Sequence, residues 1–120
     1  MNELQPQGAR VVGGESNVSG PGPEVMAADT LQGDRVLNLQ DEDLGTIDDI
    51  MIDVQRGSVA YAVLSCGGSL GIGEKYFAIP WSALTLDANR KCFVLDAPKD
   101  RFRDAPGFDK DHPPALADRA

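Results

Sequence analysis

The stretch that decides the fold is IDDIMIDVQRGSVAYAVLS, residues 47–65. Between Asp49 and Val54, isoleucine and valine alternate with aspartate and methionine, which is the period-two pattern of a strand with one face toward a core. A short polar turn containing glycine follows, and the chain returns as a β-branched and aromatic run. The stretch therefore predicts two strands, residues 47–54 and 58–65, joined by a turn.

Three further segments have the composition of strands: residues 35–39, 75–81 and 92–96. Five short strands with turn residues between them, and no long helical period, predict a mostly β chain that forms a small antiparallel β-barrel or sandwich. The residues expected to face inward are Ile50, Ile52, Val63, Phe93 and Leu95.

The two ends of the chain differ from this central part. Residues 1–29 contain five glycines, three prolines and no aromatic residue, which predicts a flexible N-terminal arm. Its segment ARVVGG could add a short strand if a sheet edge is available. The domain is expected to span residues 30–114, with one or two helical turns within residues 98–106. Residues 115–120 are expected to be frayed.

Composition limits the partners that the chain can have. Nineteen acidic and eleven basic residues give a net charge of −8, which argues against nucleic acid, because such binding needs clustered Lys and Arg, and favours basic partners. Neither a signal peptide nor an apolar run of about 20 residues occurs, which predicts a cytoplasmic protein without a membrane partner. Cys66 and Cys92 form no CxxC pair and are expected to be small buried residues.

The segment GGSLGIGEK, residues 67–75, invites comparison with a phosphate-binding loop. A P-loop requires G-x-x-x-x-G-K-[S/T] between a strand and a helix. Here Glu74 stands where the lysine belongs, Lys75 comes one place late, and the residues after it read as a strand. We therefore predict no nucleotide cofactor, and glycines that serve the shape of a wide hairpin. The glycines with this structural role are Gly67, Gly68, Gly71 and Gly73.

Several motifs together resemble the PRC-barrel domain family. They are LGTIDDIMIDVQRGSVAYAVLS, GGSLGIGEKYFAIPWSAL, FVLDAPKDRF and APGFDKD, in this order. The resemblance covers roughly residues 30–114 and is strongest to free-standing bacterial members, which are related to the cytoplasmic domain of the reaction centre H subunit and to the C-terminal domain of RimM. Ser69 and Pro113 depart from the pattern, since an aromatic residue and a tryptophan are common at these two positions.

The resemblance implies a small β-barrel with a short helical turn near PWSAL, residues 80–84, that acts as an interaction module. It implies no catalytic activity, because catalysis is not an established property of the family. The specific roles of the H subunit and of RimM are not carried over, since each depends on a further segment, a membrane helix or a separate N-terminal domain. Free-standing relatives also suggest a dimer.

Few residues suggest chemistry. The single histidine, His112, lies between prolines and charged residues without a predicted partner, so a Ser-His-Asp or Cys-His site is not expected. The densest acidic cluster does not follow the calcium-loop pattern and is read as a solvated turn. The alternative function is a small ligand- or metal-binding protein that uses this acidic turn or the glycine hairpin. The cluster comprises Asp41, Glu42, Asp43, Asp48, Asp49 and Asp53.

The favoured function is a non-catalytic protein-interaction module that forms a homodimer and has a further protein partner of unknown identity. The apolar residues around the glycine segment are expected to project and to cover a copy of themselves. Pro80 and Trp81 are expected to pin the turn after their strand onto the barrel. In the alternative, the segment APGFDKDHPP, residues 105–114, folds over the hairpin and leaves a monomer. The predicted interaction residues are Leu70, Ile72, Tyr76 and Phe77.

Overall fold

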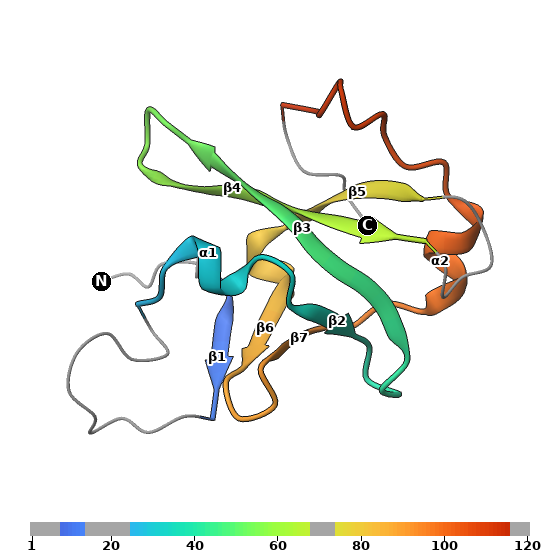
Figure 1. Cartoon of the computed structure of the whole chain (residues 1–120), viewed down its shortest axis with the longest axis horizontal. Coiled ribbons are helices and arrows are strands. Elements are labelled where there is room, and N and C mark those ends of the chain that lie inside the picture. The colour runs from blue at the N-terminus through green and yellow to red at the C-terminus, as the bar shows by residue number, and fades with distance from the viewer. Residues whose placement is uncertain (1–7, 14–24, 68–73, 116–120) are drawn as a thin grey trace, which may run out of the picture.

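A computed structural model describes residues 8–13, 25–67 and 74–115. Within these ranges, seven strands form one sheet in the order β1-β6-β7-β2-β3-β4-β5 (Figure 1). The strands are β1 (Arg10–Val12), β2 (Arg35–Leu37), β3 (Asp43–Asp53), β4 (Ser58–Cys66), β5 (Lys75–Pro80), β6 (Leu84–Asp87) and β7 (Cys92–Leu95). The helical elements are α1 (Ala28–Leu31), the 3-10 helix η2 (Trp81–Ala83) and α2 (Lys99–Asp104). The prediction of a mostly β fold with a short helical turn at PWSAL is confirmed.

The longest pairing is the antiparallel hairpin of β3 and β4, as the alternating stretch predicts. Ile50 lies opposite Ala62, and the register shifts at two places, between Ile47 and Asp49 and between Met51 and Ile52. The first of these shifts is a bulge near the start of the alternating stretch. This bulge explains why the alternation begins only at Asp49. Ile47 and Ile50 are three residues apart, and the extra residue between them allows both side chains to face the same side of the sheet.

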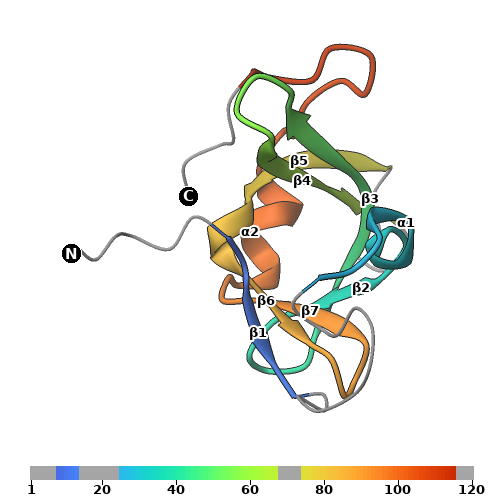
Figure 2. The same ribbon diagram turned by 90° about the vertical axis from the view of Figure 1, so that its left-hand side faces the viewer.

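Two pairings in the sheet are parallel, which the sequence does not predict. Strand β2 pairs with β7 in parallel, and β1 pairs with β6 in parallel, whereas the remaining pairs are antiparallel as expected. Among the described residues β1 and β5 do not pair with each other, so hydrogen bonds do not close the sheet into a full barrel. The sheet bends instead, so that β4 and β5 face β6 and β7, with α2 between these halves (Figure 2).

The core lies inside this bend, and three of the five expected inward residues contact it. Phe93 and Leu95 are buried in it, and Ile50 packs against it. The prediction for Val63 is wrong as to the face: Val63 is buried with Tyr61 on the outer side of the sheet, because its neighbours in β4 face the core. The prediction for Ile52 is also wrong: its side chain is 53% exposed, since the β3–β4 hairpin extends beyond the core.

The flanking segments add elements on both sides of the central sheet. Arg10–Val12, in the predicted arm, pairs along β6 as the short edge strand that ARVVGG allows. Helix α2 is the predicted helical piece before Pro106, and its Phe102 is buried in the core. No helix among the described residues is long and apolar enough to cross a membrane.

Candidate interaction surface

The residues after the glycine segment have structural partners in the fold. Lys75 begins β5 and points to the end of α2, where its Nζ donates hydrogen bonds to the carbonyl oxygens of Arg103 (2.8 Å) and Ala105 (2.6 Å). Glu74 accepts hydrogen bonds from the hydroxyls of Ser65 (3.1 Å) and Tyr76 (3.0 Å). Lys75 therefore satisfies carbonyl groups that the last turn of a helix leaves unpaired, where a cation also suits the helix dipole.

Replacing Lys75 with methionine should lower the free energy of unfolding by about 1–3 kcal/mol, because charged hydrogen bonds to the end of α2 are lost. Lys99→Met is the matched control: Lys99 begins the same helix, where a positive charge gives no favourable interaction with the dipole. Urea unfolding followed by circular dichroism measures both variants. Equal stability of Lys75→Met and the parent would contradict the capping role.

The C-terminal segment crosses the outer side of the sheet. The amide of Phe108 donates to the carbonyl oxygen of Tyr76 (2.8 Å), and the two rings lie 6.1 Å apart. Lys110 lies over the Tyr76 ring, with 5.3 Å between Nζ and the ring centroid. Further along, the hydroxyl of Tyr61 donates to the carbonyl oxygen of Pro114 (2.6 Å). The described part of the segment therefore covers β4 and β5, as the alternative prediction for residues 105–114 has it.

A glycine makes this crossing possible. Gly107 has φ +71°, and a Cβ at this position would lie 2.8 Å from the carbonyl oxygen of Tyr76. Because both the backbone angle and the close approach exclude other residues, the PGF sequence fixes where the segment meets β5.

The predicted interaction residues therefore differ in their surroundings. Tyr76 is partly buried beneath the C-terminal segment. Phe77 is buried in the core, where its ring meets that of Phe102 edge-on at 5.1 Å. Leu70 and Ile72 lie outside the described residues. Of the predicted structural residues, Gly68, Gly71 and Gly73 also lie outside them, whereas Gly67 lies next to Glu74.

Pro80 and Trp81 occupy the place that the sequence predicts for them, at the turn after β5. Pro80 precedes η2, and the Trp81 ring meets the buried Phe93 ring at 5.8 Å and 60°. Trp81 is only partly buried, however, and its remaining surface contributes to a groove described below.

The acidic residues do not converge on a single site. Asp41 pairs with Arg90 and Asp43 with Arg35, near one end of β3, and Asp53 pairs with Arg56 at the other end. Among the described residues, no three acidic, histidine or cysteine side chains are arranged to hold a metal ion. These carboxylates therefore offer ion pairs rather than a coordination site.

The remaining reactive side chains are also accounted for by local contacts. Nδ1 of His112 lies 3.2 Å from the carboxylate of Asp109 on the surface. Cys66 is buried, and its burial raises the pKa of the thiol to about 12. Burial likewise raises the pKa of the Cys92 thiol. Because a neutral thiol is a poor nucleophile, neither cysteine is activated for chemistry.

An apolar groove, called here the Trp81 groove, lies beside the N-terminal elements. It has a volume of about 420 Å³ and passes between β1, α1 and the β3–β4 hairpin, which lie near one another in Figure 1. The residues that line it all have apolar or glycine side chains: Gly8, Ala9, Val11, Met26, Ala28, Leu31, Ile50, Ile52, Val59, Trp81, Leu86 and Phe93. Sequence reasoning missed this groove, because its parts come together only through the β1–β6 pairing and the packing of α1.

Exposed apolar side chains surround the same groove. Within the described residues, seven large hydrophobic side chains are exposed. Three of these line the groove, and Val12, Val25 and Val54 lie within two residues of lining positions. Val54, at the tip of the hairpin, is 89% exposed. A concentration of this kind marks a surface for association, whereas single exposed apolar residues do not.

Taken together, these features define a small bent-sheet domain with an apolar groove and exposed apolar side chains near it. The chain belongs to the PRC-barrel domain family, whose model matches residues 23–102. No curated protein matches the sequence. Among solved structures, the chain is similar to a crystal structure of a Pseudomonas aeruginosa protein described as a 16S ribosomal RNA processing protein, RimM, at 22% identity and a TM-score of 0.44. The match covers 62% of this chain and 45% of that protein, so the chain spans about half its length.

Proposed function

We propose that this PRC-barrel domain is a non-catalytic protein-interaction module that self-associates as a homodimer through the Trp81 groove. The observation that carries the proposal is the groove itself, with exposed apolar side chains around it. The proposal moves the self-association surface away from Tyr76 and Phe77, because the C-terminal segment and α2 cover these two residues.

The two edges of the sheet support a contact on this side of the molecule. At one edge, β5 is partly protected, since Phe108 bridges to Tyr76. At the other edge, β1 pairs only with β6 among the described strands, and all three of its residues are exposed. An unprotected strand edge next to an apolar groove favours pairing with another chain.

The shape of the surface suits a two-fold contact between identical chains. The β3–β4 hairpin presents Val54 as a protrusion, and the groove beside it is a recess that Ile52 lines. In a two-fold interface each copy can supply both parts, because the same patch meets itself. The hairpin tip of one copy would then enter the groove of the other.

Charge sets the condition under which this association is strongest. Each copy carries a net charge of −8, so two copies repel each other at long range. The groove lining contains no charged residue, so the contact itself brings no acidic side chains together. Because salt screens repulsion and leaves apolar burial intact, dimerisation should strengthen as ionic strength rises.

Val54→Asp should shift the protein from dimer to monomer, because it places a charge at the hairpin tip. Leu39→Asp is the matched control: Leu39 is also exposed (62%) and introduces the same charge, but it lies before the opposite end of β3. Light scattering at several protein concentrations measures the mass, which is 12.8 kDa for a monomer and twice this value for a dimer.

A parent protein with a mass of 12.8 kDa at every concentration would refute the homodimer. Dissociation by Leu39→Asp but not by Val54→Asp would place the interface elsewhere. Both side chains are exposed, so both variants should keep the circular dichroism spectrum of the parent, and a loss of mass can be assigned to the interface.

A further inference from the structure

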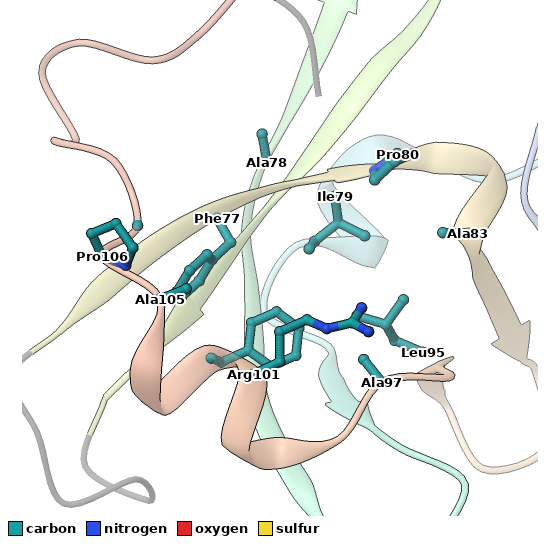
Figure 3. Close-up of a pocket in the computed structure, with 12 residues that line it drawn as sticks. Phe77, Ala78, Ile79, Pro80, Ala83, Leu95, Ala97, Arg101, Ala105 and Pro106 are labelled. Carbon is teal, nitrogen blue, oxygen red and sulfur yellow. The ribbon is translucent and has the colours of Figure 1, made fainter. Parts of the chain in front are cut away.

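A second pocket, called here the Arg101 pocket, lies on a different side of the domain from the Trp81 groove. It opens between β5, η2, the end of β7 and α2 (Figure 3) and has a volume of about 590 Å³. This volume lies within the range of small-molecule sites, roughly 300–1,000 Å³. The lining is apolar apart from one side chain and includes Phe77, Ile79, Ala83, Leu95, Ala97 and Phe102.

Arg101 is the one charged residue in this lining. Its side chain extends from α2 along the pocket that Leu95 also lines (Figure 3). Two residues further along the helix, Arg103 pairs with Asp100 at 2.8 Å, and Arg35 and Arg90 also have carboxylate partners. Arg101 has no such partner within the described residues. The chain has a net charge of −8, yet this guanidinium beside the pocket has no carboxylate partner among the described residues. It can therefore pair with an anionic ligand.

Two walls of the pocket, α2 and β5, are held in place by contacts between them that are described above. Lys75 fixes the end of α2 to the start of β5, with 2.6 Å from its Nζ to the carbonyl oxygen of Ala105. The edge-on contact of Phe77 and Phe102 anchors the middle of the helix to the same strand. Because α2 is tied to β5 in this way, the pocket walls are fixed relative to each other, and binding needs little rearrangement.

We propose that the Arg101 pocket binds a small apolar carboxylate, with its acyl chain against Ile79, Leu95 and Ala97 and its carboxylate on the guanidinium of Arg101. A planar guanidinium pairs with a carboxylate through two parallel hydrogen bonds, and the apolar walls contain no carboxylate that would compete for it. The single cationic group fits one carboxylate better than a polyphosphate, which needs several donors. This proposal does not depend on the homodimer.

The test is a titration with octanoate, followed by amide chemical shifts of the uniformly labelled protein. We expect saturable shifts at Ala97, Arg101 and Ala105, with a dissociation constant in the micromolar to millimolar range, as suits so small a ligand. Arg101→Gln should weaken binding by roughly tenfold to a hundredfold, since a charged hydrogen-bond pair is lost. Arg103→Gln is the matched control and should leave the affinity unchanged, because Arg103 lies outside the pocket lining.

Two further ligands separate the contributions of charge and of apolar contact. Octanol has the same chain without the charge and should bind the parent about as weakly as octanoate binds Arg101→Gln. Acetate has the charge without the chain and should produce no saturable shifts. Arg101→Lys should recover part of the affinity, since it keeps the charge but loses the paired geometry.

Three results would overturn the proposal. The first is the absence of saturable shifts with octanoate at concentrations well above the millimolar range. The second is equal affinity for octanoate and octanol. The third is a set of shifts at Met26 and Ile52, which would place the ligand in the Trp81 groove rather than in the Arg101 pocket.

Discussion

Replacing Gly45 with alanine should lower the free energy of unfolding by about 2–5 kcal/mol. This loss is the sum of the cost of a strained backbone and the cost of overpacking. Gly45 lies in β3 opposite Val36 of β2, and its φ is +140°, in a region that side chains rarely adopt. An added Cβ would collide with the backbone carbonyl oxygen of Ser65 in β4 and lie 3.3 Å from Leu64. Since β3 has neighbours on both sides at this point, the strand cannot move away to relieve the contact.

Gly57→Ala is the matched control for this prediction. Gly57 lies in the turn after β3 with φ +70°, but a Cβ there would have no heavy atom within 4 Å. Its replacement should therefore cost only the backbone term, about 1–2 kcal/mol. Urea unfolding of both variants separates the two terms. If Gly45→Ala costs no more than Gly57→Ala, the close approach of β3 and β4 at Gly45 is not as tight as the structure has it.

The strands that could be predicted from the sequence are those with local signals. Residues 47–54 and 58–65 have alternation and a turn between them, so they give β4 almost to the residue, whereas β3 begins four residues earlier than predicted, at Asp43. Strand β6, Leu84–Asp87, was not predicted, because its four residues directly follow η2 and read as part of a turn. Its existence depends on pairing with β7 and with the distant β1, and a single sequence does not display such non-local pairs.

The face of each strand was harder to predict than the strand itself. Alternation shows which residues share a face but not where the core ends, and for this reason Ile52 was placed inside although it is 53% exposed. Val63 was assigned to the core, yet it lies in a second buried cluster with Tyr61 and Ala78 on the outer side of the sheet. An apolar residue on that side looks the same in the sequence as a core residue, because the C-terminal segment covers it only after folding.

Contacts between residues far apart in the sequence also limited the prediction of the candidate surface. The sequence predicted a strand from Lys75, and β5 begins there, but the hydrogen-bond partner of Lys75 lies about 30 residues away at the end of α2. The alternative prediction was that residues 105–114 fold over the hairpin. Neither the Trp81 groove nor the Arg101 pocket could be predicted: the groove joins residues from Gly8 to Phe93, and the pocket depends on how α2 packs against β5 and β7.

Phe93→Ala should have an effect as large as that of Gly45→Ala, for a different reason. Phe93 lies in the interior strand β7, is fully buried (0% exposed) and packs in the main core cluster. Removing a buried aromatic ring costs about 3–5 kcal/mol, because the free energy of burying the ring is lost and a cavity is left behind. A domain of this size has a total stability on the order of 5–15 kcal/mol, so the variant should be largely unfolded or melt at a much lower temperature. Circular dichroism melting and urea titration measure the loss.

Trp81→Ala tests how much each ring of the Trp81–Phe93 pair contributes to the free energy of unfolding. Trp81 meets Phe93 at 5.8 Å but keeps part of its surface in the Trp81 groove, so its removal should cost less than that of Phe93, about 1.5–3 kcal/mol. The same variant should also weaken dimerisation, because it removes one wall of the groove. If Trp81→Ala melts within a degree or two of the parent and still lowers the mass seen by light scattering, Trp81 acts in the interface alone. If it destabilises the fold as much as Phe93→Ala does, Trp81 is a core residue, and the groove owes its shape to the other residues that line it.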